Sequence, residues 1–89
     1  MAQVHILYGV NVVLPPNFSS WSHWWESKKG KKLSKCSNIV CNNEATTCAH
    51  VQREEFNDSK WHVVPLCEKC STKRGSFFVN DIDLQEIRT

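Results

Sequence analysis

The sequence predicts a small α+β domain, and three observations support this fold class. Several short segments are rich in β-branched and aromatic residues, one segment has helical periodicity, and four of the five cysteines fall into two close pairs. A chain of 89 residues buries only a small hydrophobic core, and such a domain often needs disulfides or a bound metal ion to be stable. We expect a single domain over residues 1–89.

The cysteine pairs are the strongest local signal. Four residues separate Cys36 from Cys41, and two separate Cys67 from Cys70. Four thiolates in two close pairs are the ligands of a tetrahedral structural Zn²⁺. An odd cysteine count and an N-terminus without signal-peptide features fit a disulfide framework poorly, so we predict a cytoplasmic protein with reduced cysteines. Cys48 is then the leftover thiol, buried as a small apolar residue.

Strands are expected on both sides of the first cysteine pair. Residues 4–14 predict one strand bent at Gly9 or two short strands, because β-branched and aromatic residues dominate until two prolines follow. Downstream, the patterns predict strands over 45–51, 61–66 and 77–79, a loop over 52–60, a short helix over 67–74 and a helical or irregular tail over 81–88.

Residues 19–29 predict a short helix. Ser19 or Ser20 can cap its start, and Gly30 can end it. One face carries Trp21, Trp24, Trp25 and Lys28 at helical spacing. We expect the tryptophans to pack in the core, since large aromatic side chains supply much of the buried area of a small domain. The alternative is a stacking platform for bases or a partner surface.

The charge distribution is uneven. The formal net charge is +2, and four thiolates with one Zn²⁺ would bring it to zero. The net charge therefore does not support nucleic-acid binding. Five lysines nevertheless crowd together just before the first cysteine pair: Lys28, Lys29, Lys31, Lys32 and Lys35. Such a run is usually a solvated loop, but beside a metal site it is also a candidate for phosphate contact, with DNA as the partner. We expect no membrane association and no small-molecule cofactor.

The order of these elements resembles a known family. A cysteine knuckle, a hairpin and a helix that supplies the second ligand pair form the treble-clef plan. The segments Ala49-His50-Val51 and Val64-Pro65-Leu66-Cys67-x-x-Cys70 resemble the zinc-containing subgroup of His-Asn-His (HNH, ββα-metal) endonucleases. The resemblance covers about residues 36–74 and implies an HNH-like domain with a structural zinc, separate from a catalytic divalent ion.

The resemblance also implies catalytic positions, and here they are altered. His50 matches the histidine that activates the attacking water, and the middle position falls at His62 or loosely at Asn57. Ser71, a weak neutral ligand, stands where the family has His or Asn, and Ala49 stands where it often has an acidic ligand. His50 also has two other interpretations: a hairpin histidine hydrogen-bonded to backbone, or a zinc ligand.

Three function hypotheses follow. The first is a zinc-stabilised HNH-like domain that has lost its catalytic set and binds nucleic acid or a protein partner. The second is an active metal-dependent HNH nuclease with His50 as general base and a second divalent ion. The third is a protein-interaction module of phage or mobile-element type that binds through the tryptophan helix. The altered catalytic positions favour the first hypothesis.

Overall fold

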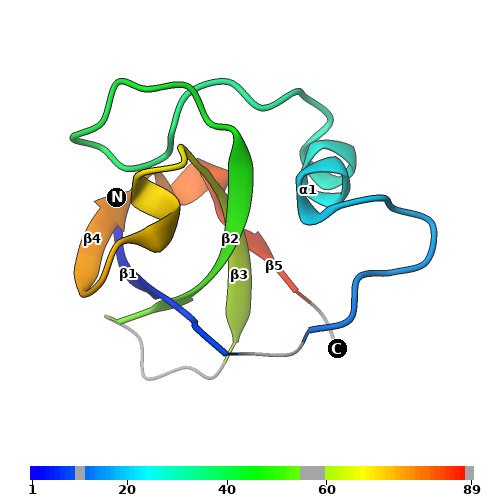
Figure 1. The fold of residues 1–89 in the computed structure, drawn as a ribbon, viewed down its shortest axis with the longest axis horizontal. Coiled ribbons are helices and arrows are strands. Elements are labelled where there is room, and N and C mark those ends of the chain that lie inside the picture. Colours follow the sequence, from blue (N-terminus) through cyan, green and yellow to red (C-terminus); the bar gives the residue numbers. More distant parts are fainter. Residues whose placement is uncertain (10–11, 55–59, 88–89) are drawn as a thin grey trace.

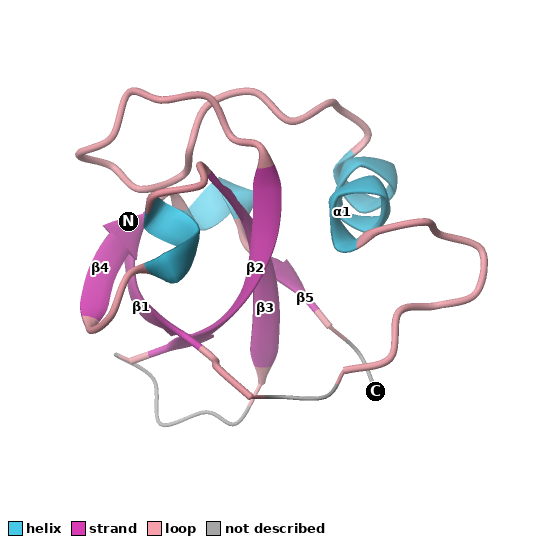
Figure 2. Ribbon diagram, viewed as in Figure 1, coloured by secondary structure: helices cyan, strands magenta, loops and turns pink. Residues whose placement is uncertain are grey.

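The computed structural model describes residues 1–9, 12–54 and 60–87. Within these residues, one α-helix accompanies a five-stranded antiparallel sheet of order β4-β1-β2-β3-β5 (Figures 1 and 2). The elements are β1 (Ala2–Ile6), α1 (Trp21–Lys29), β2 (Thr47–Arg53), β3 (Trp61–Leu66), η1 (Cys70–Thr72), β4 (Ser76–Val79), η2 (Asp81–Asp83) and β5 (Gln85–Glu86). The predicted α+β class is confirmed. No helix in this described part has the length and apolar character needed to cross a bilayer.

The β2–β3 hairpin forms the middle of the sheet and gives it two different faces. Its register pairs His50 with Val63 and Val51 with His62. Directly paired residues of an antiparallel sheet point to the same face, and consecutive residues point to opposite faces. His50 and His62 therefore lie on opposite faces of the hairpin.

Each face of the hairpin contributes to its own apolar cluster. We call the first the cysteine-side cluster; its buried members are Ala2, Val4, Ile6, Cys36, Ala49, Val51, Val64, Leu66, Cys67, Cys70, Phe77, Val79 and Leu84. We call the second the helix-side cluster; it comprises Trp24, Trp25 and Val63 with the partly buried Leu14, Phe18, Trp21, Leu33, Cys48 and Ile87. In Figure 1, β1 and β4 lie on one side of the hairpin and α1 lies on the other.

Helix α1 begins and ends at the predicted signals. The Ser20 side chain accepts a hydrogen bond of 3.1 Å from the backbone N–H of His23, which satisfies a free donor of the first turn. Gly30 ends the helix with φ 70°, a conformation that favours glycine, and its N–H bonds to the Glu26 carbonyl. The prediction of this helix is confirmed.

The tryptophans of α1 pack in the core, as predicted. Trp24 and Trp25 are only 5% and 2% exposed. Trp21 is half-buried, and its ring packs edge-to-face on Trp24 at 5.1 Å between centroids. The helix therefore attaches to the sheet by its indoles, and it does not present them together as a surface patch.

Upstream of the hairpin and within it, strand boundaries differ from those predicted. The predicted strand over 4–14 is wrong at the described residues 7–9 and 12–14, because the chain leaves the sheet after the Leu7 N–H bonds to the His50 carbonyl and then turns at Gly9 with φ 72°. Strand β2 starts two residues later than predicted and continues to Arg53, where it still pairs with β1. Asn57 lies outside the described residues.

The helix predicted over 67–74 is also wrong. The structure has only the short 3-10 helix η1, after which Lys73 is extended and Gly75 turns with φ 84°. The chain must reverse at this point because β4 starts at Ser76 and pairs with β1. Consequently, within the described residues, the helix that the treble-clef plan requires after the second cysteine pair is absent. In the described part of the predicted tail, 81–87, η2 is helical as one alternative had it, but β5 is a strand that pairs with β3 and was not predicted.

Candidate metal centre

The four paired cysteines come together in space, as the sequence predicts. Their Sγ atoms all lie within 4.8 Å of one another, and the Cys41 and Cys67 sulfurs are 3.7 Å apart. A tetrahedral Zn²⁺ with Zn–S bonds of about 2.3 Å has sulfurs about 3.8 Å apart. The four close cysteines can therefore coordinate a metal ion, and their spacing suits Zn²⁺.

Backbone hydrogen bonds shape both halves of this cluster. In the first half, the Cys36 N–H bonds to the Asn43 carbonyl and the Cys41 N–H bonds to the Asn38 carbonyl, both at 2.9 Å. In addition, the Ser37 N–H donates to the Pro65 carbonyl of β3 at 2.9 Å, which fixes the first pair beside the strand that leads into the second. The β2–β3 hairpin thus determines where both pairs lie.

Three N–H groups point at the sulfurs. The Asn38 amide donates to Cys70 Sγ at 3.5 Å, the Asn43 amide donates to Cys67 Sγ at 3.8 Å, and the Cys70 backbone N–H donates to Cys67 Sγ at 3.5 Å. Such donors stabilise the negative charge of thiolate ligands and orient them. The sequence predicts that Asn38 and Asn43 suit the tight backbone of this segment, but it did not identify their side chains as donors to sulfur; the available signal was an amide side chain two residues after each ligand of the first pair.

The thiols of the cluster differ in acidity. Burial alone would raise the pKa of Cys67, but the Cys70 backbone N–H, the Asn43 amide and neighbouring thiols outweigh it and lower that pKa to about 6. Burial raises the pKa of Cys36 to about 12 and also raises the pKa of Cys70. A metal ion that enters this site must therefore displace protons from the buried thiols.

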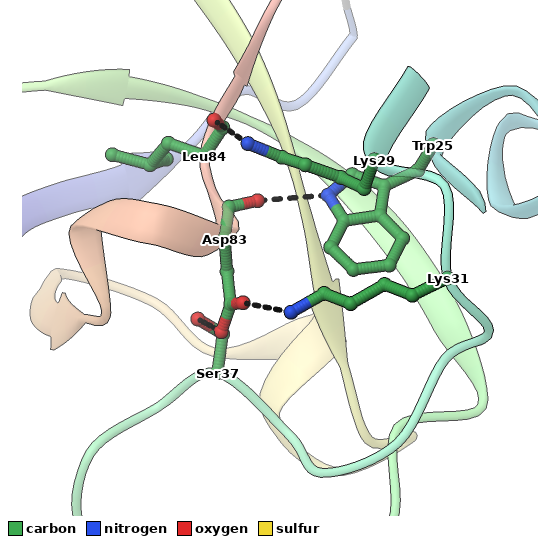
Figure 3. Close-up of polar contacts among 6 residues, drawn as sticks. All are labelled: Trp25, Lys29, Lys31, Ser37, Asp83 and Leu84. Atoms are coloured by element: carbon green, nitrogen blue, oxygen red, sulfur yellow. Dashed lines mark hydrogen bonds and ion pairs between the residues drawn. The ribbon is translucent and has the colours of Figure 1, made fainter. Parts of the chain in front are cut away.

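A polar junction connects the first cysteine pair to α1 and to the C-terminal segment (Figure 3). The Asp83 carboxylate accepts a hydrogen bond of 2.9 Å from the Ser37 hydroxyl and lies 3.8 Å from the Lys31 ammonium. The Asp83 carbonyl accepts the Trp25 indole N–H at 2.8 Å. Lys29 donates to the Leu84 carbonyl at 2.8 Å, and burial lowers its pKa. We call this group the Asp83 junction.

The five lysines predicted to contact phosphate are distributed over different roles. Lys29 and Lys31 take part in the Asp83 junction, and Lys28 lies 5.9 Å from the centre of the Trp24 ring. Lys32 and Lys35 are exposed and, together with Lys31, line a hollow of about 200 Å³ that Cys36 also lines. Part of the lysine run therefore lies directly beside the cysteine cluster.

His50 lies on the helix side of the hairpin, away from the cysteine cluster. Its ring packs edge-to-face on Trp21 with 4.7 Å between centroids, and burial lowers its pKa. Its Nε2 atom is buried and has no hydrogen-bond partner among the described residues. The interpretation of His50 as a zinc ligand is wrong, because the cluster consists of the four cysteines. Cys48, on the same face, is partly buried, and burial raises the pKa of its thiol to about 12.

The side chains at the other predicted catalytic positions do not form one site with His50. His62 is buried on the opposite face of the hairpin, and the Ser71 hydroxyl donates to the Glu68 carbonyl at 2.7 Å. In the described ranges, the four cysteines are the one group of three or more side chains that could hold a metal ion. The described residues thus contain no second group of three or more such ligands beside His50, His62 or Ser71.

In comparisons with protein-family models, with curated proteins and with solved structures, nothing matches this chain. The resemblance to HNH endonucleases rests on residues 36–74. Of the expected plan, the structure contains the hairpin between two cysteine pairs, and it has the 3-10 helix η1 in place of the longer helix.

Proposed function

We propose that this chain is a zinc-stabilised domain that acts by binding nucleic acid. The metal part rests on the cluster of four sulfurs, since thiolates in tetrahedral spacing select Zn²⁺ or iron. The amide donors around Cys67 and Cys70 support a charged, metal-bound form of these thiols. We assign Zn²⁺ a structural role, because the four cysteines fill a tetrahedron and leave no open position for a substrate.

The observation that carries the nucleic-acid part is the hollow beside Cys36. Lys31, Lys32 and Lys35 line it against the single carboxylate of Asp83, so its ionised side chains other than the cysteine ligand carry a net positive charge. Phosphate contacts by lysine provide most of the affinity of sequence-independent nucleic-acid binding. The zinc site would then act by holding the lysine-bearing segment in place.

Binding is a better proposal than hydrolysis for this arrangement. Phosphodiester cleavage needs a general base close to a metal ion that stabilises the developing charge. His50 and His62 point to opposite faces of the hairpin and cannot share one ion. If the HNH resemblance reflects ancestry, this chain has kept the metal-binding hairpin and lost the catalytic arrangement.

The test is the salt dependence of nucleic-acid affinity. We would measure the binding of labelled duplex and single-stranded DNA between about 50 and 300 mM salt, with zinc content determined in the same samples. We expect affinity to fall steeply with salt, and the Lys32→Gln/Lys35→Gln double variant to reduce the slope of log K against log salt by about 1.5–2. Lys60→Gln is the matched control, because Lys60 is an exposed lysine paired with Glu86 and does not line the hollow. Absence of binding to either DNA at low salt, or a flat salt response, would remove the proposal.

A further inference from the structure

A second cationic surface lies where the end of β1 meets the segment after η1. Tyr8 is 54% exposed, although large aromatic side chains are usually covered. Its hydroxyl donates to the Lys73 carbonyl at 2.7 Å, and the Arg74 guanidinium lies 5.8 Å from the centre of its ring. The hydroxyl group thus anchors the Tyr8 side chain, while much of the ring surface stays exposed to solvent.

The charges around Tyr8 are available for a ligand. Lys69, Lys73 and Arg74 are all exposed, and none of them forms an ion pair with a carboxylate within the described residues. Two carboxylates lie near these three cations: Glu68 in the same segment, and Glu54, which accepts a hydrogen bond from the Ser76 hydroxyl. The surface therefore combines an exposed aromatic ring with a local excess of positive charge.

We infer that Tyr8, with Lys73 and Arg74, forms a base-stacking subsite for single-stranded nucleic acid. An exposed aromatic ring can stack on any base, and neighbouring cations bind the phosphates on either side of it. A base in a duplex is already stacked and paired, so this subsite favours a single strand. The inference rests on the proposed function and names its ligand.

The subsite is independent of the lysine-lined hollow. Tyr8 follows β1, and Lys73 and Arg74 precede β4, whereas the hollow is lined largely by residues from the end of α1 to Cys36 and from the segment around η2. Variants can therefore weaken one surface without altering the other. This separation lets one experiment distinguish the failure of the subsite from the failure of the proposed function.

The experiment compares a labelled 12-nucleotide single strand with inorganic polyphosphate, which carries charge but no bases. We expect Tyr8→Leu to weaken binding of the single strand by roughly 5- to 150-fold, the range for loss of one stacked base. Its affinity for polyphosphate should stay within about twofold, since the cations remain. Tyr8→Phe keeps the ring and should retain most of the affinity, and Arg74→Gln should weaken both ligands.

The outcomes separate the two proposals. If Tyr8→Leu and Arg74→Gln bind the single strand as the unaltered protein does, while Lys32→Gln/Lys35→Gln binds it more weakly, the subsite is wrong and the proposed function stands. If the unaltered protein binds no nucleic acid, both are wrong. The near-ultraviolet tryptophan spectrum and zinc content of each variant verify that it is folded; Tyr8 is exposed and outside both apolar clusters, so its replacement should leave them unchanged.

Discussion

The two sides of the β2–β3 hairpin are stabilised in different ways. On the cysteine-side cluster, small and β-branched residues surround four sulfurs, and metal coordination can replace the apolar area that a short chain lacks. On the helix-side cluster, two buried indoles supply the area directly. One hairpin serves both because alternate residues face opposite sides. This domain therefore combines a core built around four close cysteines with a tryptophan core, and the Asp83 junction joins them.

The largest expected effect comes from loss of a metal ligand. Cys67→Ala should leave the chain largely unfolded at 25 °C. The binding free energy of a structural Zn²⁺ is about 10–16 kcal/mol, comparable to or larger than the whole stability of a typical domain. Far- and near-ultraviolet circular dichroism, with zinc analysis, would measure this.

Cys48→Ala is the matched control for that loss. Cys48 is a partly buried cysteine on the helix side and is not a member of the metal cluster. The control should keep one Zn²⁺ per chain and a cooperative thermal transition. Equal loss of zinc in both variants would mean that the two sides of the hairpin are not distinct.

Next in size is the removal of a buried indole. Trp25→Ala should lower the free energy of unfolding by about 3–5 kcal/mol, because it leaves a cavity in the helix-side cluster. Trp21→Ala should cost clearly less, since that indole is half-buried. Urea unfolding of the zinc-loaded proteins provides the comparison, and a larger effect at Trp21 would contradict the assignment of the core.

The Asp83 junction should have a smaller effect. Asp83→Asn removes the charge that faces Lys31 and weakens the bond from Ser37, so we expect a loss of about 1–2 kcal/mol in the free energy of unfolding. Asp81→Asn is the control, because Asp81 pairs with the N-terminal amine at the surface and should cost less than about 1 kcal/mol. Equal losses in the same urea measurement would show that Asp83 stabilises the fold no more than a surface ion pair does.

The smallest effect concerns pH and His50. Burial lowers its pKa below the ordinary 6.5, so the unfolded chain takes up the proton at a higher pH than the folded chain does. The stability from neutral His50 is complete above pH 6.5 and is lost as the pH falls through the folded-state pKa. His50→Phe should therefore lose less stability than the unaltered protein between pH 7.5 and 5.5. The same pH dependence in both proteins, measured by urea unfolding, would rule out this role.

Local signals in the sequence predict several elements well. The serine and glycine around α1 define its ends, the pattern over 61–66 matches β3, and the cysteine spacing identifies the cluster. Each of these depends on neighbours in the chain, where capping, periodicity and ligand spacing can be recognised.

The features that were not predicted depend on distant partners. The strand over 77–79 was predicted, but its pairing with β1, which is remote in sequence, was not, and this pairing leaves room only for the short η1 after Cys70. Strand β5 similarly forms only because β3 is beside it. The placement of His50 and His62 in one catalytic site assumed that both faced the same way, but the pairing of His50 with Val63 excludes this.

The most direct test of the metal-dependent fold is a chelator titration followed by zinc release and by the near-ultraviolet tryptophan signal. Three of the four tryptophans, Trp21, Trp24 and Trp25, are in the helix-side cluster, so most of the signal reports on the side of the hairpin that faces away from the four cysteines. We predict that zinc leaves and the tryptophan signal collapses over the same range of chelator concentration. Complete zinc release with an unchanged tryptophan signal would contradict the account.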